Sequence, residues 1–330
     1  MNPNEFQERR ARLLSLMDYE SIMVLYSGVA KVKSADECYP FEVNRNFYYL
    51  TGIDQEDSAL VLINSEGEQK EFLFVSPFDE RKEKWYGKRL TTAEAAMKSG
   101  IQNVLINTSL EAKIQQVINP DVFEYGSIRR MYIDLDDEIK IAQDTTTKDI
   151  KETIASAYPE LEMVDAYPLI TTLRLRKSAA EIEALKEAIH NTKIGIYSIW
   201  KEMAEGKKEY EMADLFLHVE NDLSGYQGLS FPTIMATGKN AACLHYPTPL
   251  DELKDGDLLL MDLGSRNEYY CADISRTVPV NGKFSDFQKT VYNIVLGANK
   301  MVAAMARPGV TIQELQDATI DYLANGCLAA

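Results

Sequence analysis

Apolar runs and amphipathic stretches alternate along roughly the first 170 residues. Short runs rich in β-branched and aromatic residues predict strands, and apolar residues spaced three or four apart predict helices. The predicted strands are Ile22 to Tyr26, Ser58 to Ile63, Glu71 to Val75, Val104 to Ile106 and Met131 to Ile133. The predicted helices are Phe6 to Leu16, Thr92 to Lys98 and Leu110 to Ile118. This alternation predicts an α/β sheet domain.

Helical periodicity dominates the next segment of the chain. Ser178 and Glu181 have the spacing of a capping box, which marks the start of a helix. An apolar series follows at positions that share one face of a long helix: Ile182, Leu185, Ile189, Ile196, Ile199 and Met203. Two more helices are predicted, from Tyr210 to Asp222 and from Ser285 to Ala306.

Two aspartates, Asp262 and Asp273, stand in a predicted hairpin between these last two helices. Leu258 to Met261 is an apolar run, so we expect the first strand to be buried on both faces. A turn centred on Asn267 and Glu268 would place the two carboxylates directly opposite each other, where like charges are destabilising. A divalent cation would offset the repulsion, because hard oxygen ligands suit manganese, magnesium or calcium. If the register slips by one residue instead, one aspartate faces solvent.

Length, charge and cysteine spacing narrow the class of protein. A chain of 330 residues commonly forms two domains, predicted here at 1–172 and 173–330. The net charge of −16 argues against nucleic-acid and anionic-membrane partners. No apolar run has the length of a signal-peptide core or a membrane span, so we expect a cytoplasmic protein. The scattered Cys38, Cys243, Cys271 and Cys327 are expected to be reduced, mostly buried thiols.

Ordered motifs span almost the whole chain. The first part carries Arg45-Asn-Phe-Tyr-Tyr-Leu-Thr-Gly52, Phe74-Val-Ser-Pro77 and Trp85-Tyr-Gly87. The second part carries Leu173-Arg-Leu-Arg-Lys-Ser178, Ala236-Thr-Gly-Lys-Asn-Ala-Ala-Cys-Leu-His-Tyr246, Met261-Asp-Leu-Gly264 and Ala272-Asp-Ile-Ser-Arg-Thr277. In order and spacing the chain resembles the pita-bread metallopeptidases, specifically Xaa-Pro aminopeptidase (aminopeptidase P). The resemblance implies a creatinase/prolidase-like α/β domain followed by the first part of a pita-bread α+β catalytic domain.

The resemblance also implies a site and a reaction. Asp262 and Asp273 would be the first two ligands of a pair of divalent metal ions, usually Mn²⁺, with Asp273 bridging both. His245 matches the family's active-site histidine, which contacts substrate, whereas structural roles are expected for His190 and His218. The implied substrates are peptides with proline in the second position. A homo-oligomer, either a dimer or a tetramer, is also implied.

The chain departs from the family pattern after Asp273. The family completes its metal site with a histidine and two glutamates that lie further along, but here no histidine follows His245 and Glu314 is the only later glutamate. We therefore expect a sequence cut short at Ala330, with two of the family's five ligands. Such a chain would bind Mn²⁺ poorly and hydrolyse peptides negligibly, whereas the full-length parent would be active.

Two alternatives remain open on sequence grounds. Prolidase shares the fold, metals and motifs but accepts only dipeptides, so comparing a dipeptide with a tripeptide substrate would separate the two activities. The other alternative is a naturally truncated, non-catalytic module used for binding or dimerisation. This second alternative predicts a protein that unfolds cooperatively and lacks metal-dependent turnover.

Overall fold

The fold is known from a computed structural model that describes residues 1–330 apart from 66–67, 120, 135–151, 153 and 224–226. The chain forms two compact units, Met1–Ala180 and Glu181–Ala330. Each unit has its own sheet and its own buried core. In the described part of the chain, no helix is both long and apolar enough to cross a bilayer.

Unit 1 is built on a six-stranded mixed sheet with the strand order β6-β5-β4-β1-β7-β8. The strands are β1 (Ser21–Tyr26), β4 (Ala59–Ser65), β5 (Glu68–Val75), β6 (Val104–Ile106), β7 (Arg130–Ile133) and β8 (Glu162–Asp165). Strand β4 runs antiparallel to β1 and β5, whereas the β1–β7, β7–β8 and β5–β6 pairs are parallel. All five predicted strands are present, and β8 is an addition that the pattern did not predict.

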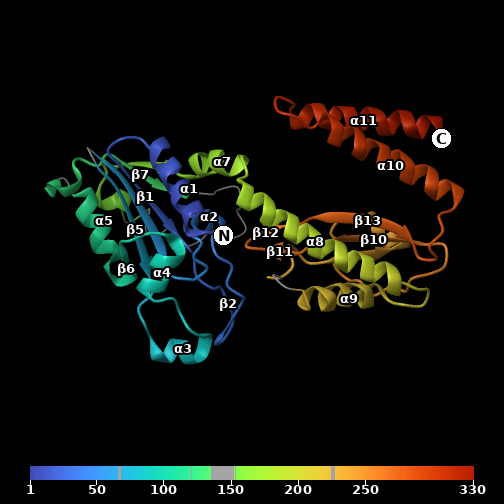
Figure 1. Ribbon diagram of the computed structural model, residues 1–330, viewed down its shortest axis with the longest axis horizontal. Coiled ribbons are helices and arrows are strands. Elements are labelled where there is room, and N and C mark those ends of the chain that lie inside the picture. The colour runs from blue at the N-terminus through green and yellow to red at the C-terminus, as the bar shows by residue number, and fades with distance from the viewer. Residues whose placement is uncertain (66–67, 120, 135–151, 153, 224–226) are drawn as a thin grey trace. The chain divides into compact units, whose positions relative to one another are not determined.

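Helices cover both faces of this sheet, as Figure 1 shows, with α5 on one side and α1 and α2 on the other. The helices are α1 (Pro3–Leu16), α2 (Arg45–Thr51), α3 (Glu80–Tyr86), α4 (Thr92–Ser99), α5 (Leu110–Ile118) and α7 (Tyr167–Leu175). A short hairpin of β2 (Val32–Ser34) and β3 (Glu37–Cys38) precedes α2. Because both faces are covered, every residue of β1 is buried. The predicted α/β domain is confirmed.

Unit 2 packs two helices against one face of a small antiparallel sheet with the order β13-β10-β9. The helices are α8 (Ala179–Glu202) and α9 (Glu209–Asn221), and the strands are β9 (Ile234–Thr237), β10 (Leu258–Leu263) and β13 (Ile274–Pro279). Short strands β11 (Arg266–Asn267) and β12 (Tyr270–Cys271) extend the β10–β13 hairpin. The core includes Ile199 of α8, Phe216 of α9 and Met261 of β10.

The buried face of α8 differs from the predicted one in its first half. Ile182 and Ile189 are 43% and 46% exposed, whereas Ala184 and Ala188 are buried. Gly195, one turn from the end of this buried stripe, lies so close to Phe216 of α9 that an added Cβ would be 2.4 Å from the ring. The glycine allows α9 to approach α8 closely at this point. In the first half of α8, hydrophobicity alone predicted the wrong buried face.

Two further sequence expectations are wrong. Strand β10 is not buried on both faces: Leu259, Met261 and Leu263 are buried but the alternate residues are only half-buried, because α8 and α9 cover one face. The four cysteines are free thiols, but three of them are exposed and Cys38 is half-buried. Cys38 and Cys271 are in the short strands β3 and β12, Cys243 is in a loop and Cys327 is on α11 (Ile312–Ala329), and none of them is part of either core.

The last two helices, α10 (Asp286–Met305) and α11 (Ile312–Ala329), pack against each other. Two glycines make this contact close: an added Cβ would lie 2.2 Å from the Tyr322 hydroxyl at Gly297 and 2.6 Å from Ile294 at Gly326. The helix predicted from Ser285 to Ala306 is confirmed as α10, with Ser285 as its cap.

Candidate metal and substrate site

The register of the β10–β13 hairpin decides where the two aspartates lie. Asp262 is paired directly with Ser275, not with Asp273. The turn falls on Glu268 and Tyr269, whose φ angles are +47° and +66°, so it is centred one residue later than predicted. The prediction that the two carboxylates lie directly opposite each other is therefore wrong. The residue types could not reveal this turn, because two turn residues at positive φ are usually Gly, Asn or Asp, and here they are Glu and Tyr.

When the centre of the turn moves by one residue, the pairing between the two strands moves by two residues. An even shift of this kind keeps both carboxylates on the same face. Side chains alternate along a strand, and the residue paired with Asp262 is two positions from Asp273. Asp273 directly precedes β13, and extending the β10–β13 register by one residue would make the two aspartates diagonal neighbours, an arrangement whose typical Cα separation is roughly 7–8 Å. Asp262 is half-buried and Asp273 is exposed. The Ser275 hydroxyl donates a hydrogen bond to Asp262 Oδ1 at 2.8 Å.

The opposite face of the same hairpin is held by a buried polar cluster. Ser265 follows β10, and its backbone N–H donates to the Thr192 hydroxyl of α8 at 2.9 Å. The Ser265 hydroxyl donates to the Glu220 carboxylate of α9. Burial raises the pKa of Glu220, and the Ser265 hydrogen bond lowers it in part. The sequence did not predict this cluster, because none of its residues forms a recognisable motif.

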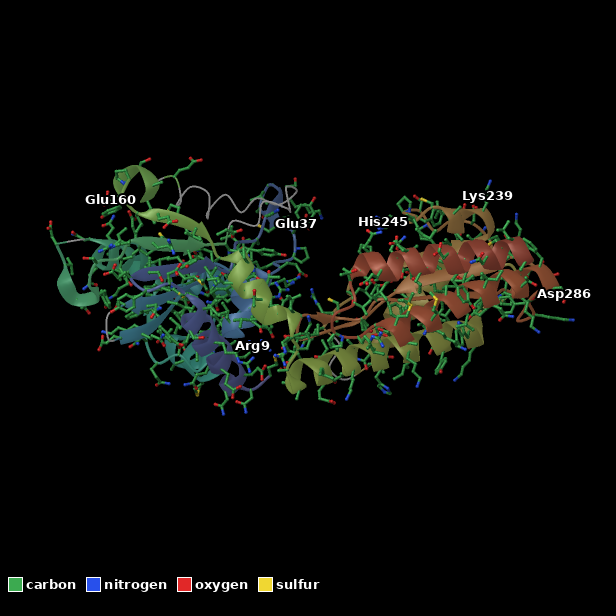
Figure 2. All side chains as sticks on the ribbon, turned by 90° about the horizontal axis from the view of Figure 1, so that it is seen from above. Arg9, Glu37, Glu160, Lys239, His245 and Asp286 are labelled. Carbon is green, nitrogen blue, oxygen red and sulfur yellow. The ribbon has the colours of Figure 1, made fainter. Side chains whose placement is uncertain are left out.

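His245 is exposed on the loop 238–250, which follows β9. Strand β9 pairs with β10, and Ile234 of β9 lies directly beside Asp262 of β10. The loop that carries His245 therefore follows the strand next to the one that carries Asp262. Figure 2 shows His245 and Lys239 on one edge of this unit. Among the described residues, the His245 side chain forms no hydrogen bond. Its position therefore depends on the conformation of the loop.

The chemistry of Asp262 and Asp273 fits a divalent cation. Their oxygens are hard ligands, and both side chains reach solvent. In the described part of the chain neither carboxylate forms a salt bridge, so no lysine or arginine neutralises the pair. The described residues include no cluster of three or more His, Cys, Asp or Glu side chains that could hold a metal. The two aspartates therefore fit a metal ion in the type of their donor atoms, and they are the two carboxylate ligands that the described residues supply.

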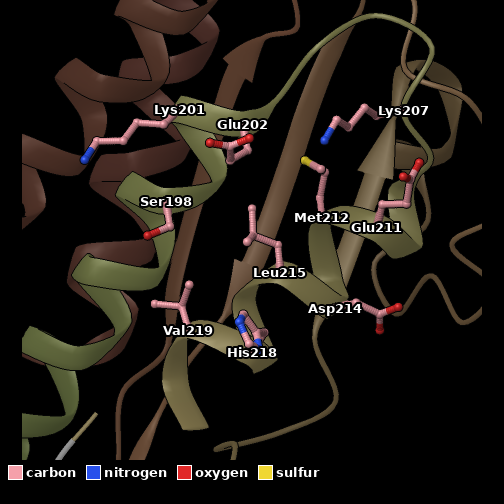
Figure 3. Close-up of a pocket in the computed structure, with 10 residues that line it drawn as sticks. All are labelled: Ser198, Lys201, Glu202, Lys207, Glu211, Met212, Asp214, Leu215, His218 and Val219. Carbon is pink, nitrogen blue, oxygen red and sulfur yellow. The ribbon is translucent and has the colours of Figure 1, made fainter. Parts of the chain in front are cut away.

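An open groove lies elsewhere in unit 2, between α8 and α9. It has a volume of about 570 Å³, and Figure 3 shows lysines and carboxylates of both helices and their connection around it. His218 lines this groove and is exposed, as is His190. None of the predicted site residues lines it, because Asp262 and Asp273 are on the face of the sheet opposite these helices.

Comparison with known proteins gives a consistent result for both units. Residues 6–123 match the family described as aminopeptidase P, N-terminal domain, and residues 183–329 match metallopeptidase family M24. Xaa-Pro aminopeptidase of Haemophilus influenzae is 32% identical over 98% of this chain and 71% of that protein. The chain therefore spans a little over two thirds of the length of this relative.

Solved structures agree with this assignment. A structure from Bacillus anthracis assigned as an aminopeptidase P matches with a TM-score of 0.94 and 37% identity, over the whole of this chain and 77% of that one. Zinc-substituted Escherichia coli aminopeptidase P in complex with product matches with a TM-score of 0.87 and 29% identity, over the whole of this chain and 74% of that one. The predicted fold class and enzyme class are confirmed. The chain belongs to the Xaa-Pro aminopeptidases (aminopeptidase P) of metallopeptidase family M24, which are metal-dependent hydrolases.

Proposed function

We propose that this protein releases the N-terminal residue from peptides with proline in the second position, with Mn²⁺ as its metal. The observation that carries the proposal is the placement of Asp262 and Asp273 on one face of the β10–β13 hairpin, with no cationic side chain paired to either in the described part of the chain. Relatives named Xaa-Pro aminopeptidase support the choice of substrate.

Asp262 and Asp273 would supply two of the metal ligands. Bound divalent ions lower the pKa of a ligated water towards neutrality and polarise a substrate carbonyl. Ser275 would hold Asp262 in place, because its hydroxyl occupies one lone pair of Oδ1 and leaves the second oxygen for the metal. Hydrogen-bonded supports of this kind keep a carboxylate in one orientation and strengthen binding.

His245 would contact the substrate. A neutral imidazole can donate one hydrogen bond to a peptide carbonyl or accept one from an amide, and it can exchange a proton near neutral pH. Exposure of His245 on its loop is compatible with access by a peptide. Proline in the second position lacks an amide N–H and has a fixed φ, so a dedicated pocket is needed to accept it.

The test uses two proteins. One is the 330-residue chain, and the other is a fusion in which the part of the Haemophilus influenzae relative that follows the matched region is joined after Ala330. In the fusion we expect Mn²⁺-dependent release of the first residue from a tripeptide with proline second, and much weaker release when alanine is second, whereas the 330-residue chain is expected to hydrolyse either peptide negligibly. The fusion is expected to be the more active protein, because two carboxylates alone coordinate a metal weakly.

Matched variants test the assigned residues in the fusion. Asp262→Asn and Asp273→Asn are each expected to lower kcat/KM by at least about a hundredfold, which corresponds to about 2.7 kcal/mol. Asp255→Asn is the control, because its exposed carboxylate pairs with Asn281 instead. Full turnover in a folded Asp262→Asn fusion would contradict the ligand assignment. A preference for the dipeptide over the tripeptide would point to prolidase activity.

Self-association into a dimer or tetramer is the last part of the proposal. The family resemblance is its support. Light scattering of the purified 330-residue chain measures the mass directly, and a monomer at concentrations of tens of micromolar would contradict it.

A further inference from the structure

Glu209 is a fully buried carboxylate at the first position of α9. A buried carboxylate is costly unless hydrogen-bond donors surround it. Each oxygen of Glu209 accepts two hydrogen bonds, and the four donors come from the last residue of β9 and from the segment that joins β9 to β10. This segment includes the loop that carries His245.

The four donors flank that loop and lie within it: Thr237 directly precedes the loop, Asp251 directly follows it, and Asn240 and Tyr246 lie inside it. Glu209 Oε1 accepts from the Thr237 backbone N–H at 2.7 Å and from Asn240 Nδ2 at 3.0 Å. Glu209 Oε2 accepts from the Tyr246 hydroxyl at 3.1 Å and from the Asp251 backbone N–H at 3.0 Å. One carboxylate thus joins both ends of the loop to two side chains within it.

Backbone hydrogen bonds reinforce the same junction. The Glu209 N–H donates to the Asp251 carbonyl at 3.0 Å, and the Tyr210 N–H donates to the Pro249 carbonyl at 2.9 Å. Asn240 Nδ2 also donates to Asp251 Oδ2 at 2.8 Å, which links the beginning of the loop to its end. The base of the loop is therefore a closed hydrogen-bonded ring, with Glu209 at its centre.

We propose that Glu209 is a positioning residue for His245, an inference that rests on the proposed function of that histidine. Tyr246 is the direct neighbour of His245, and its hydroxyl is held by Glu209. The imidazole itself has no hydrogen bond among the described residues. The place of His245 is thus set by the backbone on either side of it, which Glu209 holds through Asn240, Tyr246 and Asp251.

The charge of Glu209 matters as well as its shape. A glutamine has the same size but presents one acceptor oxygen and one NH₂ group. Because all four partners of Glu209 donate, the NH₂ group of Glu209→Gln would face two donors and lose both hydrogen bonds. Either the Thr237 and Asn240 side or the Tyr246 and Asp251 side of the junction would open.

The experiment follows the three histidines of the chain by NMR. Their imidazole C–H signals are assigned with His190→Gln, His218→Gln and His245→Gln. In Glu209→Gln we expect the His245 signal to shift and broaden, while the signals of His190 and His218, which lie on α8 and α9, stay in place. The amide protons of Thr237 and Asp251 are expected to exchange with solvent at least about tenfold faster.

A purely structural role gives a different result. Loss of stability throughout the unit would speed the exchange of all its amide protons by one common factor, and a rearrangement throughout the unit would move all three histidine signals. Either outcome would overturn the inference, as would an unchanged His245 signal. If Glu209→Gln does not fold, Tyr246→Phe and Asn240→Ala carry the test, because each removes a side-chain donor to Glu209. Tyr246→Phe should shift the His245 signal and leave the exchange of the Thr237 amide unchanged.

This test needs neither metal nor turnover, so it separates two failures. A shifted His245 signal in Glu209→Gln, together with full activity of the fusion carrying His245→Ala, would refute the proposed role of His245 and leave the positioning by Glu209 intact. An unshifted signal, together with lost activity in His245→Ala, would refute the positioning and leave the proposed function standing. In the fusion, we expect Glu209→Gln to lower kcat more than it raises KM.

Discussion

Ser275 donates its hydroxyl hydrogen to Asp262 Oδ1 at 2.8 Å, across directly paired positions of β10 and β13. The hydrogen bond fixes the rotation of one carboxylate on a face that carries a second, Asp273. An unneutralised pair of carboxylates repels, and a cation removes that repulsion. The arrangement favours a site in which the protein orients a ligand before the metal binds.

Ser275→Ala is expected to weaken Mn²⁺ binding by about tenfold, because loss of a group that orients a ligand costs 10- to 100-fold in affinity. The free Mn²⁺ signal in electron paramagnetic resonance measures the affinity of the fusion described above, which is the parent chain of both variants. Thr277→Ala, two residues further along the same strand, is the control and should leave the affinity unchanged. Equal affinities for Ser275→Ala and the parent chain would show that the hydroxyl does not orient the ligand.

Gly195→Ala is expected to destabilise unit 2 by about 1–3 kcal/mol. A Cβ at this position would lie 2.4 Å from two ring carbons of Phe216 and 3.0 Å from Glu220 Oε1, so α8 and α9 would have to separate. This cost opposes a gain of about 1 kcal/mol in helix propensity. Urea unfolding measures the difference, with the exposed Lys201→Ala on the same helix as control. A stabilised Gly195→Ala protein would show that the two helices adjust easily.

Glu220→Gln should change the pH dependence of stability. Because burial raises the pKa of Glu220 above 4.5, the folded protein holds this proton more tightly than the unfolded chain. The free energy of unfolding therefore falls as pH rises from about 4.5 through the raised pKa of the folded state. Glutamine does not titrate, so the stability of Glu220→Gln relative to the parent chain should increase over this range and level off above it.

Urea unfolding of both proteins at several pH values between about 4.5 and 8 checks this prediction. The exposed Glu202→Gln controls for the loss of one negative charge. A stability difference between Glu220→Gln and the parent chain that stays constant with pH would mean that Glu220 does not exchange its proton on unfolding.

Arg10→Met should be among the most destabilising single changes in unit 1. The Arg10 side chain is fully buried, and it donates to Glu71 at 3.0 Å, to the Leu50 carbonyl at 2.8 Å and to the Ser99 carbonyl at 3.0 Å. Its removal leaves the Glu71 carboxylate without its cation and takes a donor away from the Leu50 and Ser99 carbonyls. We expect a loss of about 3–5 kcal/mol in the free energy of unfolding.

Chemical denaturation of Arg10→Met and of Arg12→Met provides the comparison. Arg12 is exposed on the same helix, so its replacement should change stability by less than about 0.5 kcal/mol. Similar losses for the two variants would mean that the buried hydrogen bonds of Arg10 contribute little.

Local sequence patterns were sufficient for most of the regular structure. Periodicity identified five strands and three helices of unit 1, because these elements bury a face whose pattern follows the strand or helix repeat. The start of α10 at Ser285 was also predicted, and the structure shows a local capping box there between Ser285 and Gln288, which needs no distant partner. Ordered motifs identified the family, whereas the residue spacing left open whether Asp262 and Asp273 share one face of the hairpin.

Tertiary structure decided what depends on partners far apart in sequence. The hairpin register followed from a turn at Glu268 and Tyr269 that the residue types do not favour. The buried face in the first half of α8 differed from the predicted one, and further along the helix Gly195 allows α9 to approach closely. Glu209 and Glu220 look like ordinary surface carboxylates in the sequence. In the folded protein both carboxylates are buried and accept hydrogen bonds, and the donors come from segments tens of residues away in the sequence.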